Sequence, residues 1–149
     1  MSQANETLAH RFHMDIFVEG DLDAADEILS PDFVWHGGYS PGEDQRGPES
    51  VKQVASAIMS ALPDTRMSHE DTVVGGDKVL VRWRSTGTHE GELMGVPPTG
   101  RRVTMTGFDL FRIEGGKIAE MWQEADRLGL MQQLGVIPPQ GQGEGQAPG

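Results

Sequence analysis

The 149-residue sequence predicts a single α+β domain in which three helices precede a run of long strands. Apolar residues recur at helical spacing in the first 62 residues, whereas apolar and polar side chains alternate along much of residues 67–123. Tight-turn signals at Gly75-Gly76-Asp77 and Gly115-Gly116 separate the later segments. Helices followed by consecutive antiparallel strands are typical of the α+β class rather than of repeated βα units.

Three helices are expected in the first half of the chain, at residues 6–18, 22–29 and 48–62. Each has apolar side chains three or four residues apart, which places them on one buried face. The apolar positions are Leu8, Phe12 and Ile16, then Leu22, Ala25 and Ile28, then Val51, Val54 and Ile58. Asp21 is suited to cap the second helix, and Pro48 is suited to the first turn of the third.

Five strands and a last short helix complete the part of the chain that is expected to be ordered. The strands are residues 33–36, 67–74, 78–88, 101–114 and 117–123, and the helix is residues 126–134. A curved sheet of such long strands, wrapped around the helices, would leave a cavity between the two layers. We therefore expect a domain that encloses a pocket for a small organic molecule.

The composition restricts the possible partners. The net charge is −11, with 12 basic against 23 acidic residues, whereas nucleic acid and anionic membranes are bound by clustered Lys and Arg. We therefore expect neither as a partner. The absence of cysteine excludes disulfides and thiolate chemistry. His10 and His13 fall on one helix face, but no third ligand accompanies them, so no metal is expected.

The chain is expected to form one pocket domain at residues 1–137. Residues 138–149 consist almost entirely of Pro, Gly and Gln, a composition that cannot bury apolar area, and we expect this tail to be disordered. The first residues lack the apolar core of a signal peptide. No stretch approaches the roughly 20 apolar residues of a membrane span. A soluble protein of the cytoplasm is the expectation.

Short motifs follow one another in a defined order between Val79 and Gly135. They are Val81-Arg82-Trp83, Gly87-Thr88-His89-Glu90-Gly91, Gly95-Val96-Pro97-Pro98-Thr99-Gly100-Arg101, Phe111-Arg112-Ile113, Glu120-Met121-Trp122 and Gln133-Leu134-Gly135. Their order and spacing resemble those of the SnoaL-like polyketide cyclases and predicted ester cyclases. The resemblance covers roughly residues 5–137, and the segment Phe33-Val34-Trp35-His36 is similar to an early strand of that family.

The resemblance implies the cone-shaped α+β fold of the nuclear transport factor 2-like superfamily. In that fold three helices line a strongly curved antiparallel sheet around a deep pocket, and homodimers are common. The implied reaction is the closure of a ring in a polyketide ester by intramolecular aldol condensation, without a cofactor or a metal. The implied acid/base group is Asp126, and the implied dimer uses the outer face of the sheet.

Asp126 can also be evaluated from its surroundings in the sequence. One carboxylate can remove and return a proton if burial raises its pKa toward the working pH. Trp122, Leu128 and Leu130 are close in sequence and could supply the apolar surroundings that such a shift needs. The alternative is that Asp126 only caps the helix that it begins, because Asp is a preferred N-cap residue. The two roles can coexist.

Several other polar residues are candidates for the pocket. His89 could donate a hydrogen bond to an enolate oxygen as a second catalytic group, or it could be an exposed loop histidine. His36 could bind substrate or bond a backbone carbonyl. Arg82 could bind substrate too, although a structural ion pair with Glu120 is the favoured interpretation.

The remaining candidates for substrate binding are the tryptophans and Asp109. The tryptophans offer flat surfaces for an aromatic ligand, although in small domains they are more often core residues. They are Trp35, Trp83 and Trp122. Residues 101–114 contain no histidine to assist Asp126, unlike the characterised cyclases. Asp109 on that strand could instead form a carboxylate pair with Asp126 that shares one proton.

The sequence thus predicts a cofactor-independent acid/base enzyme that acts on a small polyketide-like ester or ketone by an aldol-type cyclisation. One alternative is a non-catalytic domain for small-molecule binding or dimerisation. Another is an epoxide hydrolase or ketone isomerase on the same fold, for which Asp126, Arg82 and Asp109 are nominal counterparts of an Asp–Arg–Asp set. A shared fold does not fix the reaction.

Overall fold

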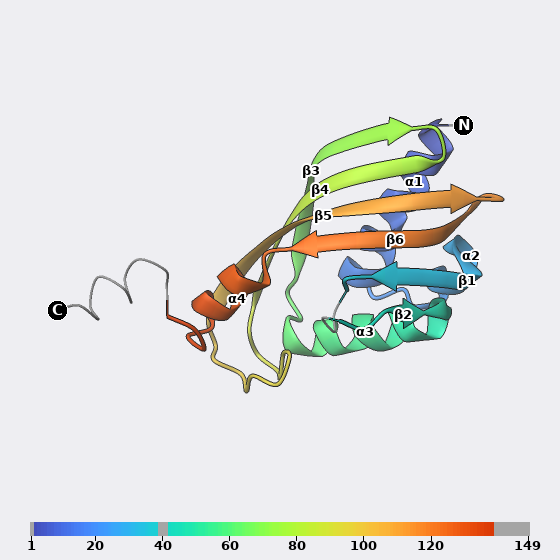
Figure 1. Ribbon diagram of the computed structural model, residues 1–149. Coiled ribbons are helices and arrows are strands. Elements are labelled where there is room, and N and C mark those ends of the chain that lie inside the picture. The colour runs from blue at the N-terminus through green and yellow to red at the C-terminus, as the bar shows by residue number, and fades with distance from the viewer. Residues whose placement is uncertain (1, 39–41, 139–149) are drawn as a thin grey trace.

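The structure is a computed structural model that describes residues 2–38 and 42–138 (Figure 1). One six-stranded sheet is covered on one face by helices, which confirms the α+β class. The helices are α1 (Ser2–Arg11), the π-helix η1 (Phe12–Val18), α2 (Asp23–Ile28), α3 (Gly47–Ala61) and α4 (Arg127–Gln133). The strands are β1 (Leu29–His36), β2 (Gln45–Arg46), β3 (Arg66–Gly75), β4 (Lys78–Thr88), β5 (Arg102–Glu114) and β6 (Lys117–Ala125). The expected tail, apart from Pro138, lies outside the described residues.

The sheet has the strand order β2-β1-β6-β5-β4-β3 and does not close into a barrel. Strands β3 to β6 form antiparallel hairpins, as the sequence predicts. The turn between β5 and β6 consists of Gly115 and Gly116, with φ of 60° and 77°. A two-residue hairpin turn of this type needs positive φ at both positions, which glycine adopts without steric cost.

Strand β1 differs from the expectation in length and in direction. It begins at Leu29 instead of Phe33, and it pairs with β6 in parallel, so the sheet is not wholly antiparallel. Pro31 is tolerated because the β1–β6 register shifts between Leu29 and Val34, where no ladder hydrogen bond from its nitrogen is needed. The parallel direction is possible because α3 and four strands separate β1 from β6 along the chain.

The first helix is longer than expected and changes its winding midway. It begins at Ser2, and its second half is the π-helix η1. In a π-helix the hydrogen bonds join residues five apart, so residues four and five apart lie on the same side. Four side chains of η1 are therefore buried together, and they are Phe12, His13, Ile16 and Phe17. No helix among residues 2–38 and 42–138 has the length and hydrophobicity needed to cross a membrane.

The inner face of the sheet packs on the helices in two apolar clusters. The larger cluster joins η1, α2 and α3 to the inner side chains of β1, β4, β5 and β6, with Phe12, Phe33 and Phe111 fully buried. The smaller cluster lies where α4 meets β5, around Val103 and Leu130. The outer face carries exposed Phe108 and Trp122, together with charged residues. The homodimer expected through this face stays a prediction.

Gly107 on β5 allows a tryptophan to lie flat against the sheet. Its register partner is Trp83 on β4, and a Cβ atom at position 107 would lie 2.5 Å from Trp83 Cζ2 and 2.9 Å from the Glu124 carbonyl oxygen. The backbone of β6 at Glu124 cannot shift easily without disturbing the sheet, so the Trp83 ring would have to move to make room for the Cβ atom.

We predict that Gly107→Ala lowers the free energy of unfolding by about 1–3 kcal/mol, the usual cost of overpacking. The matched control is Gly75→Ala, because a Cβ atom there has no neighbour within 4 Å. The control should stay within about 0.5 kcal/mol of the parent protein in urea unfolding followed by circular dichroism. Equal losses in the two variants would contradict the packing that we describe.

Candidate functional site

A cavity lies between the helices and the inner face of the bent sheet, and members of both apolar clusters line it. Its apolar lining includes aromatic and methionine side chains, among them Phe12, Phe17, Trp35, Trp83, Met67 and Met105. Its polar lining consists of His13, Thr65, Ser85, Gln123 and Arg127. No carboxylate of the described residues is part of this lining. Such a mostly apolar cavity with a few polar groups suits a small organic molecule.

His13 is joined to a carboxylate that is completely buried. Its Nε2–H group donates a hydrogen bond to Asp109 Oδ2 at 2.6 Å. Asp109 is 0% exposed and His13 is 3% exposed. The alternation of β5 turns Asp109 inward, and the π-helical winding of η1 turns His13 toward it. A buried carboxylate is stable only with a partner that offers charge or hydrogen bonds.

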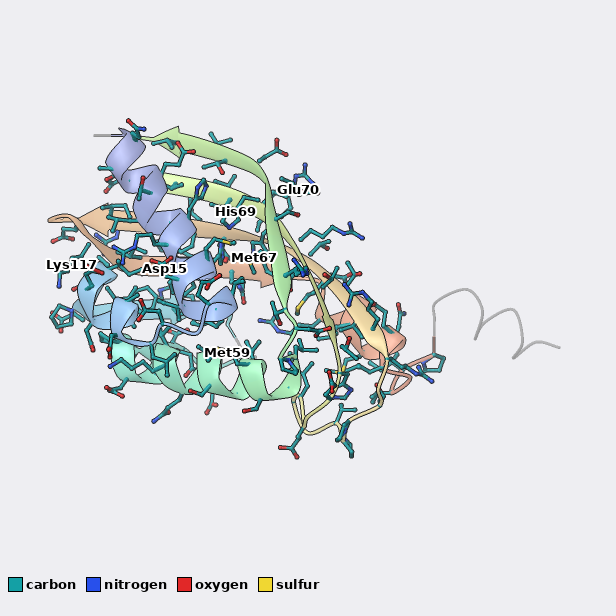
Figure 2. The ribbon with its side chains drawn as sticks, turned by 180° about the vertical axis from the view of Figure 1, so that it is seen from behind. Asp15, Met59, Met67, His69, Glu70 and Lys117 are labelled. Carbon is teal, nitrogen blue, oxygen red and sulfur yellow. The ribbon has the colours of Figure 1, made fainter. Side chains whose placement is uncertain are left out.

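A second histidine extends this contact toward β3. His13 Nδ1 lies 2.9 Å from His69 Nε2, and the ring of His69 stacks on that of His10, with centroids 4.4 Å apart. Figure 2 shows His69 and Met67 extending from β3 toward the helices, while Glu70 extends away from them. We name Asp109, His13 and His69 the histidine chain. Burial, followed by the charges of His13 and His10, lowers the pKa of His69 from 6.5 to about 4.

Two of the predicted substrate-binding residues line the cavity, and a third supports it. Trp35 from β1 and Trp83 from β4 are both lining residues. Both are also members of the larger apolar cluster, so the core and pocket interpretations hold together. Asp109 acts behind His13 and is not itself part of the lining.

The structure places His36 and Trp122 on the outer face of the sheet. Their rings stack with centroids 5.4 Å apart. His36 Nε2 is 2.7 Å from Glu120 Oε2, and this hydrogen bond holds the pKa of Glu120 below its usual value. Neither ring is part of the cavity lining, because both residues alternate away from the buried neighbours Trp35 and Met121.

The prediction of an ion pair between Arg82 and Glu120 is wrong. Arg82 does face away from the core, but its Nε donates to Asp71 Oδ2 at 2.7 Å. Asp71 is the register partner of Arg82 on β3, whereas β5 separates Arg82 from β6. Arg112 on β5 contacts Glu120 instead.

Asp126 is the N-cap of α4. Its Oδ1 accepts a hydrogen bond from the backbone N–H of Gly129 at 2.8 Å, and the side chain is exposed. The residue borders a shallow depression on the outer face and is not part of the cavity lining. The expected carboxylate pair with Asp109 does not form, because Asp109 points inward. The capping interpretation is therefore confirmed.

His89 is buried outside the cavity, where it fixes a loop. Its Nδ1 accepts a hydrogen bond from the backbone N–H of Thr99 at 3.2 Å, and its backbone bonds Gly100 and Arg101. The exposed-loop alternative is thus wrong. The loop that His89 closes contributes Leu93 and Met94 to the cavity lining. His89 therefore acts on the cavity through the loop.

Reasoning from the sequence does not place six polar residues of the site. They are His13, Thr65, His69, Ser85, Gln123 and Arg127. Alternation along β6 could have indicated Gln123, since it follows buried Met121 by two residues. The contact between His13 and Asp109 joins residues 96 positions apart, and no local pattern reports it.

Nearly the whole chain is similar to known proteins of one family. The family model of the SnoaL-like polyketide cyclases matches residues 7–134. Aklanonic acid methyl ester cyclase DnrD of Streptomyces peucetius is 28% identical over 131 residues, which cover 87% of this chain and 90% of that protein. Nogalonic acid methyl ester cyclase of Streptomyces nogalater is 29% identical over 128 residues, which cover 85% of this chain and 95% of that protein.

Solved structures agree with these relatives. TsrD from Streptomyces laurentii superimposes with a TM-score of 0.82 at 31% identity, covering 92% of this chain and 98% of its own. IdmH from Streptomyces antibioticus superimposes with a TM-score of 0.74 at 35% identity, covering 90% of this chain and 99% of its own. The nuclear transport factor 2-like fold that the motifs imply is thereby confirmed. The chain belongs to the SnoaL-like polyketide cyclase family.

Proposed function

We propose that the chain is an enzyme that cyclises a small polyketide-like ester or ketone by an aldol-type reaction, without a cofactor. His13, supported by Asp109, is the proposed acid/base group. The observation that carries the proposal is the place of His13. Among the described residues of the cavity lining, it is the one imidazole, the group that acts most often as a general acid or base, and its buried partner is a carboxylate.

The proposed reaction moves one proton and forms one carbon–carbon bond. His13 removes a proton from a carbon beside a carbonyl group, and the electrons of the C–H bond form an enolate. The enolate carbon attacks a ketone carbon of the same molecule, and the electrons of the C=O bond become an alkoxide. The alkoxide takes the proton back from the imidazolium of His13. Atoms and electrons balance without an oxidant or a reductant.

Asp109 prepares His13 for this task. Its carboxylate accepts the hydrogen bond from Nε2–H, which leaves the lone pair on Nδ1 as the basic nitrogen. The carboxylate also stabilises the positive charge that His13 acquires, and it does so strongly because the contact is shielded from water. Carboxylate–histidine pairs in other active sites orient the ring in the same way.

His69 regulates access to the basic nitrogen of His13. In the structure, His69 Nε2 lies within hydrogen-bond distance of His13 Nδ1. A substrate that reacts with Nδ1 must therefore displace His69 from this contact. Within the described part of the chain, the side chain of His69 has no other hydrogen bond, and its ring stacks on that of His10. With a pKa of about 4, His69 is neutral at pH 7 and does not repel a protonated His13.

The alternatives are less well supported. A non-catalytic binding domain would need neither an imidazole in the lining nor a buried carboxylate behind it. The proposed epoxide-hydrolase set is not brought together, since Arg82 and Asp126 lie on the outer side and Asp109 points inward. The named substrates of the relatives are methyl esters of aklanonic and nogalonic acid, and these two compounds are the first to test.

We predict that Asp109→Asn slows ring closure of nogalonic acid methyl ester by about 100-fold or more, the usual contribution of acid/base catalysis. The matched control is Asp126→Asn, which also replaces a carboxylate by an amide but lies outside the cavity and keeps a capping oxygen. Its rate should stay within about threefold of the parent, which is under 1 kcal/mol. Chromatography of the product would measure both rates.

Substrate binding, followed by tryptophan fluorescence, should persist in both variants. A parent-like rate in Asp109→Asn would contradict the assignment of His13 and Asp109. Loss of activity in Asp126→Asn alone would restore Asp126 as the acid/base group. Absence of turnover in the parent protein with either ester would favour the non-catalytic domain.

We predict a second effect, on stability, from the lowered pKa of His69. Between about pH 6.5 and about pH 4 the unfolded chain takes up a proton at this residue and the folded chain does not. The free energy of unfolding should therefore fall as the pH falls through this range. His69→Gln should remove this part of the decline, because glutamine does not titrate.

Urea unfolding at a series of pH values from 7.5 to 4.5 would measure the effect. Ser68→Ala is the control, since Ser68 is the neighbour of His69 on β3 and does not titrate. The control should keep the full decline of the parent protein. The same pH dependence in His69→Gln and in the parent protein would contradict a neutral, half-buried His69.

A further inference from the structure

Three side chains with N–H groups meet at one side of the cavity, beside Gly37 and Gly38. We propose that Trp35, Gln123 and Arg127 form an oxyanion site, which binds a ligand oxygen that carries negative charge as part of an enolised 1,3-dicarbonyl group. The inference rests on the proposed function, because it names the part of the substrate that this cavity recognises. It adds a binding role for residues that the acid/base mechanism does not use.

Two glycines allow these three residues to lie close together. Arg127 Nη2 donates hydrogen bonds to the carbonyl oxygens of Gly37 and Gly38. A Cβ atom at Gly37 would lie 2.6 Å from the Gln123 carbonyl oxygen, and one at Gly38 would lie 2.6 Å from Trp35 Nε1. The backbone of the two glycines therefore lies against Arg127, the Trp35 ring and the main chain of Gln123, and any larger residue there would push these residues apart. The side chains of all three residues line the cavity.

The donors of this oxyanion site have capacity to spare. Trp35 is 3% exposed, and its Nε1–H has no acceptor. Within the described part of the chain, the side-chain amide of Gln123 has no hydrogen-bond partner, and Arg127 uses only Nη2. A buried donor without an acceptor destabilises the folded protein, because it has lost its hydrogen bonds to water. An oxygen atom of a bound ligand would remove that destabilisation at Trp35.

The charge of the site favours an anion. Arg127 is the one cation in the described cavity lining, which contains no carboxylate, and no ion pair involves Arg127 among the described residues. A guanidinium group binds two oxygen atoms side by side through its planar fork of N–H groups. An enolised 1,3-dicarbonyl presents two such oxygens in one plane and shares its negative charge between them. The aromatic walls of the cavity suit a flat ring system next to that group.

The oxyanion site and the histidine chain border the same ligand. Gln123 is the register partner of Asp109 on the neighbouring strand, and His13, Gln123 and Arg127 all line the cavity. The enolate that forms when His13 takes a proton would therefore have its oxygen beside the donors of the oxyanion site. Donors that are already in position stabilise such charge without rearranging during the reaction.

The test uses 2-acetyl-1-tetralone, a bicyclic 1,3-diketone whose enolate absorbs at longer wavelength than its neutral form. Absorbance titration with pH, in the presence and absence of excess protein, gives the apparent pKa of the probe. The parent protein should lower that pKa by about one unit or more, a tenfold preference for the enolate. Arg127→Met should abolish the shift, and Arg127→Lys should restore part of it, because lysine keeps the charge but lacks the fork.

Arg84→Met is the matched control, since Arg84 is exposed on the outer side of β4 and its loss changes the net charge equally. It should keep the full shift. Trp35→Phe and Gln123→Leu each remove one donor and should reduce the preference by about threefold, which provides an independent check if Arg127→Met does not fold. Melting curves monitored by circular dichroism establish folding.

His13→Gln separates this inference from the proposed function. It should lose turnover of the methyl ester and keep the shift in the pKa of the probe. A parent protein that leaves the probe's pKa unchanged, with or without binding, would overturn the oxyanion site. A full shift in Arg127→Met, Trp35→Phe and Gln123→Leu would overturn it as well, and neither result would affect the assignment of His13.

Discussion

The buried carboxylate of Asp109 is the constraint on which the site depends. Removing a carboxylate from water costs several kcal/mol, and one hydrogen bond to His13 at 2.6 Å compensates only part of it, since Asp109 Oδ1 has no partner. Two apolar side chains of similar volume would often give equal or greater stability at such a position. Stability alone does not explain this pair, whereas the acid/base role that we propose for His13 would explain it.

Much of the fold could be predicted from the sequence because its signals are local. The β5–β6 turn follows from Gly115-Gly116, and the alternation along β4 follows from Val79, Val81 and Trp83. The errors arose where distant contacts override local preference. The direction of β1 depends on its pairing with β6, and the winding of η1 depends on burying four side chains against the sheet. Neither the direction of β1 nor the π-helical winding of η1 is indicated by the residues of its own segment.

The site was less predictable than the fold, and Asp126 shows why. Its position after β6 was informative, but the chain turns there, so that Asp126 caps α4 from the outside while its neighbour Arg127 reaches the cavity. Two consecutive residues thus lie on opposite sides of the sheet, and the sequence does not show which of them faces the cavity. For His13 the sequence indicates only a helix face shared with His10, because only the three-dimensional structure brings Asp109 and His69 to it.

The oxyanion site and the histidine chain that we propose complement each other electrostatically. Proton transfer from a neutral ligand to a neutral His13 creates a positive imidazolium and a negative enolate in an apolar space, where separating charge is costly. Asp109 lies behind the imidazolium, and Arg127 faces the position proposed for the enolate oxygen. Each charge that appears therefore has a fixed opposite charge beside it. In the proposed reaction, this pair of fixed charges would stabilise the imidazolium and the enolate at the same time.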